Sequence, residues 1–152
     1  MVLVVTQAGG GAGGGTPNLD GMGIVTSGGP QSLPNNVMTV VTGFWTAQWD
    51  DSAFFNVGTQ TVTVPATGRY LLTGTCAFGA NTIGERRVFL RKGTGTFLAS
   101  VSSEAPAARD YVTVTQQAEL TAADTVEMRV DQNSGGALNI DIAYLQVTRI
   151  NA

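Results

Sequence analysis

The segment Thr125-Val-Glu-Met-Arg-Val-Asp131 alternates apolar and charged residues without a break. An alternation with a period of two is the signature of a strand that is buried on one face only. We therefore expect the two valines and Met128 to point into a core, and the three charged residues to point outward. The turn residues Gln132-Asn-Ser-Gly-Gly136 then end the strand.

The same period continues upstream of this segment. Similar runs cover Thr59–Val64, Arg69–Phe78, Arg87–Arg91 and Tyr111–Ala118, with turn clusters at Pro65–Gly68 and Lys92–Gly95. No long stretch keeps the helical period of about 3.6 residues. Many short strands at regular spacing predict an all-β protein, built as a sandwich or a barrel.

The last apolar region, Leu138–Ile150, changes phase along its length. Leu138, Ile140 and Ile142 share one face of a strand, whereas Leu145 and Val147 share the other. Either a bulge lies near Ala143-Tyr144, or both faces of this strand are covered. We favour the second interpretation, in which the strand lies between the core and a subunit interface.

The composition indicates that the surface of the chain is partly covered. The chain has 152 residues, about the length of one domain. Only 12% of the residues are charged, about half of the usual share of roughly 25%. No apolar run approaches the about 18 residues that a membrane-spanning helix requires. A subunit interface is the simplest cover for such a surface.

The composition also argues against catalysis and nucleic-acid binding. The chain has no His, which excludes Ser-His-Asp, Cys-His and imidazole metal sites formed within it. The single Cys76 lies in an alternating segment, where a free thiol is usually buried, and it has no partner for an internal disulfide. The net charge is −3 and the basic residues are scattered. We predict no enzyme activity and no cofactor.

Residues 1–30 differ from residues 31–152. They contain half of the 20 glycines and one charge, Asp20. We predict that they form an extended Gly-rich N-terminal arm in front of a single domain. An arm with so few side chains is expected to dock on a neighbouring subunit or on a different protein, and the alternative is a tail without a partner. Residues at its tip are expected to add a strand to another sheet: Val2, Leu3, Val4 and Val5.

Aromatic and acidic residues gather just after this arm. Within twelve positions lie Phe44, Trp45, Trp49, Phe54 and Phe55. We expect these rings to pack in the core and in a subunit interface. The alternative is an exposed patch of Trp45, Trp49, Phe54 and Phe55 that contacts a glycan or another protein.

The neighbouring pair Asp50-Asp51 supplies carboxylates of the kind that bind Ca²⁺. A solvated loop that keeps the adjacent aromatic residues soluble is the expectation that we prefer. We therefore predict no metal site, and the calcium interpretation stays open as the alternative.

Several segments carry a family resemblance in the right order, namely Gln31–Val41, Thr61–Leu72, Arg86–Arg91, Ala118–Met128 and Tyr144–Ile150. The segment Thr61–Leu72 contains an apolar–Pro–x–x–Gly–x–Tyr signature that ends at Tyr70. In the segment Ala118–Met128, Ala123 occupies a position where a glycine is usual. Together they resemble the globular-head family of the complement recognition protein, within the tumour necrosis factor-like superfamily.

The resemblance implies an antiparallel jelly-roll sandwich that assembles as a homotrimer about a threefold axis. It also implies binding or scaffolding rather than catalysis. In such a trimer, we expect Ile142 and Tyr144 to lie in the subunit interface.

The biological setting is inferred from two sequence features that the chain lacks, a signal peptide and a collagen repeat. Met1–Thr6 has no positively charged start, so we expect no signal peptide, and the glycines do not repeat every third residue as in a collagen stalk. The chain therefore looks most like a component of a phage particle. We predict a virion structural protein, a trimeric capsid decoration or head-fibre protein at the virion surface, anchored to the major capsid protein by its arm. The alternative is a receptor- or glycan-binding tip module of a tail fibre or minor tail protein.

Overall fold

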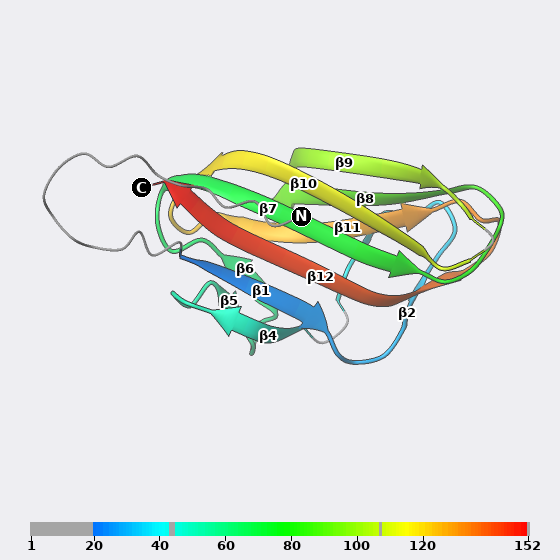
Figure 1. Cartoon of the computed structure of the whole chain (residues 1–152), viewed down its shortest axis with the longest axis horizontal. Helices are drawn as coiled ribbons and strands as arrows, with labels where there is room; N and C mark the ends of the chain where they lie inside the picture. Colours follow the sequence, from blue (N-terminus) through cyan, green and yellow to red (C-terminus); the bar gives the residue numbers. More distant parts are fainter. Residues whose placement is uncertain (1–19, 43–44, 107, 152) are drawn as a thin grey trace, which may run out of the picture.

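The computed structural model describes residues 20–42, 45–106 and 108–151, and these form two antiparallel sheets (Figure 1). Sheet A has the order β10 (Asp110–Leu120), β7 (Gly68–Phe78), β12 (Leu138–Asn151), β1 (Gly21–Thr26) and β4 (Trp45–Asp50), with β2 (Gln31–Leu33) also paired to β12. Sheet B has the order β5 (Phe55–Asn56), β6 (Thr61–Thr63), β11 (Thr125–Gln132), β8 (Glu85–Lys92) and β9 (Thr96–Glu104), with β3 (Thr39–Val40) also paired to β11.

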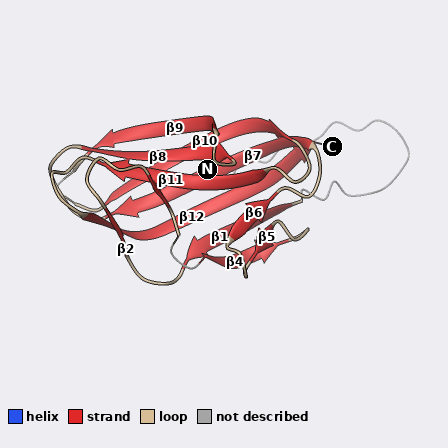
Figure 2. Ribbon diagram, turned by 180° about the vertical axis from the view of Figure 1, so that it is seen from behind, coloured by secondary structure: helices blue, strands red, loops and turns tan. Residues whose placement is uncertain are grey.

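The two sheets pack face to face, as the opposite views in Figures 1 and 2 show. The predicted inward face of Thr125–Asp131 is confirmed, because Val126, Met128 and Val130 of β11 all belong to the buried core. Of the charged residues expected to point outward, Glu127 and Arg129 are partly exposed, whereas Asp131 is only 6% exposed beside Arg87. Cys76 of β7 is also buried, as expected. The described residues contain no helix, so none that could span a membrane. The predicted all-β antiparallel sandwich is confirmed.

Side chains of sheet B come close to the backbone of sheet A at Gly74, in the middle of β7. A Cβ atom at this position would lie 2.8 Å from Sδ of Met128 and 3.1 Å from Cδ2 of Leu90. The side chains of β8 and β11 therefore fill the space that a side chain at Gly74 would need. Glycine is unfavourable in a strand, and here the close packing of the opposite sheet accounts for it.

The predicted domain boundary after residue 30 is wrong. Strand β1 lies inside that predicted arm, yet it pairs with β12 on one side and with β4 on the other. Met22 and Ile24 of β1 are 0% and 1% exposed. The sandwich therefore includes β1, and residues 1–19, including Val2, Leu3, Val4 and Val5, lie outside the described residues.

A bulge in β12 explains the phase change in Leu138–Ile150. The register with β7 pairs Ile140 with Phe78 and Ile142 with Ala77, so Asp141 is the additional residue. Leu138 and Ile140 are buried before the bulge, and Ala143, Leu145 and Val147 are buried after it. The bulge was one of the two predicted explanations, and it lies two residues before the predicted position.

The turn before β11 keeps a left-handed backbone although it lacks the usual glycine. Ala123 has a φ of 71°, and its N–H donates to the carbonyl oxygen of Val64 at 2.9 Å. The Asp124 carboxylate accepts a hydrogen bond from the Thr121 N–H at 2.7 Å. These bonds hold an alanine in a conformation that glycine adopts more easily.

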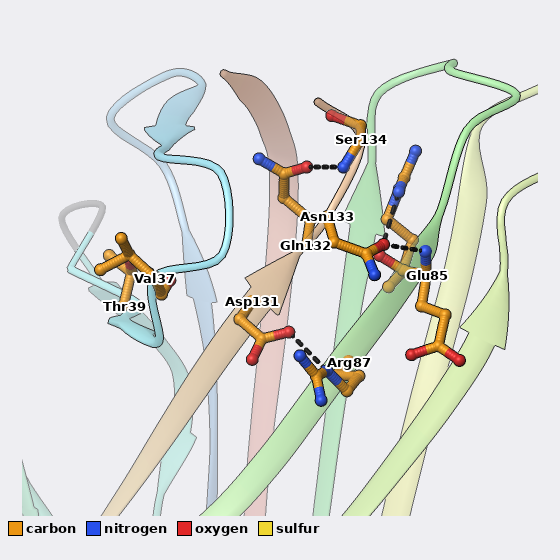
Figure 3. Close-up of polar contacts among 9 residues, drawn as sticks. Val37, Thr39, Glu85, Arg87, Asp131, Gln132, Asn133 and Ser134 are labelled. Atoms are coloured by element: carbon orange, nitrogen blue, oxygen red, sulfur yellow. Dashed lines mark hydrogen bonds and ion pairs between the residues drawn. The ribbon is translucent and has the colours of Figure 1, made fainter. Parts of the chain in front are cut away.

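Polar side chains fasten the turns at the end of the sandwich shown in Figure 3. Asn133, just after β11, accepts a hydrogen bond from the N–H of Glu85 at the start of β8. The buried Gln132 side chain accepts from the Ser134 N–H at 2.7 Å and donates to the Gly136 carbonyl oxygen at 2.8 Å. The β11–β12 turn is thereby tied both to itself and to β8.

Arg86 is a fully buried cation at the same end. Its guanidinium donates to the carbonyl oxygens of Asn81, Ile83 and Glu85 at 3.0–3.2 Å. Burial lowers the pKa of Arg86, and the charge of Asp110 partly opposes this shift. The arginine therefore organises the β7–β8 loop from inside, where neutral oxygens replace its water.

We predict that Gly74→Val destabilises the fold by about 1–3 kcal/mol, because the new side chain collides with Met128 and Leu90 although valine favours strands. Urea unfolding followed by circular dichroism measures this change. Gly95→Val is the matched control, since nothing lies within 4 Å of a Cβ atom at Gly95. Equal stability of the two variants would contradict the close approach at Gly74.

Candidate functional site: the outer face of sheet A

The outer face of sheet A is built from the residues that alternate with the core residues of its strands. Adjacent strands bring them into rows, such as Thr113–Thr75–Tyr144–Val25 and Thr115–Thr73–Gln146–Gly23. We call this surface the A face. On the three longest strands it consists of Leu71, Thr73, Thr75, Ala77, Tyr111, Thr113, Thr115, Gln117, Ile142, Tyr144, Gln146 and Thr148.

The A face carries charges only at its two ends. Arg69 and Glu119 form an ion pair at 2.8 Å at one end, and Arg109 and Asp141 form another at 2.7 Å at the other end. Between these pairs, no outward-facing residue of β7, β10 or β12 in the described chain is charged. Another protein could therefore cover the A face without desolvating charged side chains.

The outer face of sheet B has the opposite character. Its strands present Arg87, Arg91, Glu127, Arg129 and Asp131. Arg87 contacts Asp131 at 2.7 Å (Figure 3), and Arg129 contacts Glu127 at 3.2 Å. Arg91 also lies 4.5 Å from the ring centre of Phe97. Arg87, Glu127 and Arg129 are partly exposed to water, whereas Arg91 and Asp131 are only 7% and 6% exposed and are held by these contacts.

Pairs of hydrogen-bonded threonine side chains lie on the A face between β7 and β10. The hydroxyls of Thr75 and Thr113 are 2.9 Å apart, and those of Thr73 and Thr115 are 3.3 Å apart. Cross-strand threonines of this kind stabilise a sheet. Because their hydroxyls already bond to one another, covering these side chains would cost little in lost hydrogen bonds.

The bulge at Asp141 directs Ile142 and Tyr144 to the A face. Both side chains are half-buried within one chain, and both lie on the central strand β12. Tyr144 pairs with Thr75 of β7 on one side and with Val25 of β1 on the other. The two residues predicted for a subunit interface therefore lie on one continuous surface.

Trp49 lies over two glycines at the β4 end of the A face. A Cβ atom at Gly21 would lie 2.9 Å from the indole atoms Cη2 and Cζ3, and one at Gly23 would lie 2.5 Å from Nε1. The indole therefore rests against the backbone of β1, while 38% of Trp49 remains exposed. By register, Gln146 and Thr148 are the next residues across the sheet.

The alternative of one exposed aromatic patch is wrong for Trp45 and Phe54. Trp45 is 6% exposed, and its indole N–H donates to the Val41 carbonyl oxygen at 3.1 Å. Phe54 is 1% exposed and packs edge-on against Tyr70. Phe55 is partly buried against the core, and Phe44 lies outside the described residues. Only Trp49 of the described rings in this cluster reaches the A face.

Asp50 and Asp51 do not converge on a shared site. The two carboxylate oxygens of Asp50 accept hydrogen bonds from the N–H groups of Phe54 and Phe55 at 2.8 and 2.9 Å. Asp51 is exposed. The described residues contain no group of three or more potential metal-ligating side chains, and the Asp50 carboxylate is engaged in closing a turn.

The thiol of Cys76 is enclosed between the sheets. Burial raises its pKa, and the nearby Asp141 charge adds to the shift. A thiol with a raised pKa holds its proton and is a poor nucleophile. Tyr70 is also buried, which raises its pKa, and its hydroxyl donates to the Ala66 carbonyl oxygen. Both groups therefore serve the packing of the sandwich.

Solved structures reveal which fold this sandwich has. An Eiger TNF from S. frugiperda is 12% identical with a TM-score of 0.69, and the match covers 88% of this chain and 93% of that one. The globular domain of a zebrafish complement 1qA protein is 12% identical with a TM-score of 0.60, covering 87% and 98%. The fold is a tumour necrosis factor-like jelly roll. The predicted fold class is thereby confirmed.

Two further similar proteins come from viruses. The PRD1 vertex protein P5 is 19% identical with a TM-score of 0.62, and the match covers 88% of this jelly roll and 98% of that chain. The uncharacterized protein L688 of Acanthamoeba polyphaga mimivirus is 27% identical over 132 residues, which is 81% of this chain. The alignment spans 56% of that viral protein, just over half its length. No family model matches the jelly-roll chain.

We predict that Gly23→Ala displaces the Trp49 indole, because the new methyl group would lie 2.5 Å from Nε1. The buried Trp45 serves as an internal reference. Acrylamide should therefore quench the tryptophan fluorescence of the variant more strongly than that of the natural chain. Gly136→Ala is the control, since nothing lies within 4 Å of a Cβ atom there. Identical quenching in all three proteins would show that the indole does not rest on Gly23.

Proposed function

We propose that this protein is a non-enzymatic structural component of a virus particle that assembles as a homotrimer through the A face. The observation that carries this proposal is the contrast between the two outer faces. The A face lacks charge between its terminal ion pairs, whereas the outer face of sheet B is charged along its two adjacent strands β8 and β11. An interface buries its uncharged surface and leaves charged residues at the rim.

The dimensions of the A face fit a stable interface. Strands β7 and β10 each have 11 residues. At about 3.3 Å per residue and about 4.8 Å between strands, five strands give a face of about 35 by 20 Å, or about 700 Å². A standard interface buries about 800 Å² per partner. In a closed threefold ring, the A face of each subunit would pack against a different surface of the next subunit, with Ile142 and Tyr144 near the centre of the A face.

The viral setting is supported by the two viral proteins that share the fold or the sequence. We place the protein at the virion surface, as a capsid decoration or head-fibre protein. In this proposal residues 1–19 form the anchor, and Val2, Leu3, Val4 and Val5 add a strand to the major capsid protein. A segment of this length reaches at most about 68 Å from Asp20 when extended.

A second function is favoured by Trp49. An exposed indole beside the polar side chains of Gln146 and Thr148 is the kind of surface on which a sugar ring stacks. In that case the protein is a receptor- or glycan-binding tip module of a tail fibre or minor tail protein. The two functions differ in their dependence on the arm, since only the decoration protein needs residues 1–19.

We predict that Tyr144→Asp and Ile142→Asp each dissociate the trimer, because each would bury an unpaired carboxylate in the interface. Light scattering coupled to size exclusion should then give the mass of one chain instead of three. Ser100→Asp is the matched control, since Ser100 is exposed on β9 in sheet B and should leave the trimer intact. An unchanged trimer in both A-face variants would refute this interface.

We predict that the full-length chain cosediments with undecorated capsids and that a chain beginning at Asp20 does not. The shortened chain must retain β1, because Met22 and Ile24 belong to the core. Its folding and trimer mass are checked by circular dichroism and light scattering. If neither chain binds capsids and both bind host-surface glycans in a Trp49-dependent manner, the tip-module function replaces the decoration function.

A further inference from the structure

Sheet B contains an opening where β11 changes its partner. On one edge, β11 pairs with β3 through Arg129 and Val130, and with β6 through Thr125 and Val126. The intervening residues, Glu127 and Met128, have no register partner in β3 or β6. On this edge, the Met128 carbonyl oxygen accepts a hydrogen bond from the N–H of Val41, just after β3, at 3.1 Å. A gap between the ends of β3 and β6 follows from this change.

A cavity of about 200 Å³ extends from this gap into the space between the sheets. Its inner walls come from both sheets and are apolar: Ile24, Val41, Trp45, Val62, Met128 and Leu145. All six residues belong to the buried core. A closed apolar cavity of about 150 Å³ accepts one benzene-sized ring, so a space of this volume is large enough for one ring.

The rim of the cavity is polar and is held in place by Gln60. This residue has a φ of 56°, a left-handed conformation that is uncommon outside glycine. Its side-chain oxygen accepts from the Trp45 N–H at 2.6 Å, and its side-chain nitrogen donates to the Val57 carbonyl oxygen at 2.7 Å. Each end of the amide keeps one further hydrogen-bonding position. Backbone strain of this kind concentrates at ligand sites.

The remaining rim residues disfavour ionic ligands. Thr61, Thr94 and Thr125 supply hydroxyl groups. The Glu127 carboxylate also lines the rim and is bridged to Arg129 at 3.2 Å. An ion of either sign would lose its water on entering the apolar interior, and an anionic ligand would also meet this carboxylate.

We propose that this cavity is a binding site for one small, uncharged ring compound that carries a single hydroxyl group, of the phenol class. The ring occupies the space between the sheets, and the hydroxyl bonds to the Gln60 amide at the rim. The site opens on the side of sheet B, so it does not depend on the A face or on the arm. Its failure would therefore leave the proposed trimer untouched.

The test is a titration of the full-length protein with phenol, followed by methyl NMR. We expect saturable shifts of the Met128, Val62 and Leu145 methyl groups, with a dissociation constant of about 0.1–1 mM. Benzoate has the same ring with a negative charge and should bind at least about tenfold more weakly.

A cavity-filling variant gives an independent readout. Val62→Phe places a ring in the cavity, so it should fold normally and weaken phenol binding at least about tenfold. Val130→Phe is the matched control, because Val130 is fully buried but does not line the cavity, and overpacking there should lower the melting temperature. The proposal is overturned if phenol shifts none of the cavity methyls, if benzoate binds equally well, or if Val62→Phe binds phenol unchanged.

Discussion

The antiparallel pairing of β7 with β12 is the constraint on which the rest of this structure depends. Their ladder runs from Ile140 and Phe78 to Asn151 and Arg69, and it forms the centre of sheet A. The register decides which side chains enter the core and which form the A face, since a slip of one residue would exchange the two sets. The bulge at Asp141 is part of this register. It lets β12 bury Ile140 on one side of the bulge and Leu145 on the other, while Ile142 and Tyr144 point outward.

The same pairing divides the molecule into a face that can be covered and a face that stays in water. Charges are concentrated on sheet B and at the ends of the A face, where ion pairs mark its limits. Glycines are used where two layers come close: Gly74 admits Met128 between the sheets, and Gly21 and Gly23 let Trp49 lie against β1. Each of these glycines gives up side-chain packing in a strand. The resulting surface is uncharged between its terminal ion pairs and carries the partly exposed indole of Trp49, which suits contact with another protein chain.

The jelly roll itself does not specify a function, because the same fold occurs in the insect, vertebrate and viral proteins to which this chain is similar. The features that distinguish this chain lie on its surfaces and in the gap beside β11. The A face and the cavity are on opposite sides of the sandwich and use different residues. An assembly surface and a small-ligand site can therefore coexist, since covering the A face leaves the cavity mouth between β3 and β6 open.

The strands of the sandwich were predictable from the sequence wherever a period of two was long and strict, as in Thr125–Asp131 and Arg69–Phe78, because alternation alone separates a buried face from an open one. Strand β1 was missed for a physical reason. Gly21-Met-Gly-Ile24 has weak strand preference by itself, and it is extended because β12 and β4 pair with it on both sides. The burial of Trp45 and Phe54 and the position of the bulge also depended on contacts between residues distant in sequence. Local pattern thus determined that this protein is a β-sandwich. Only the tertiary structure decided which outer face is uncharged and where a cavity remains, since both result from strands that meet across the fold.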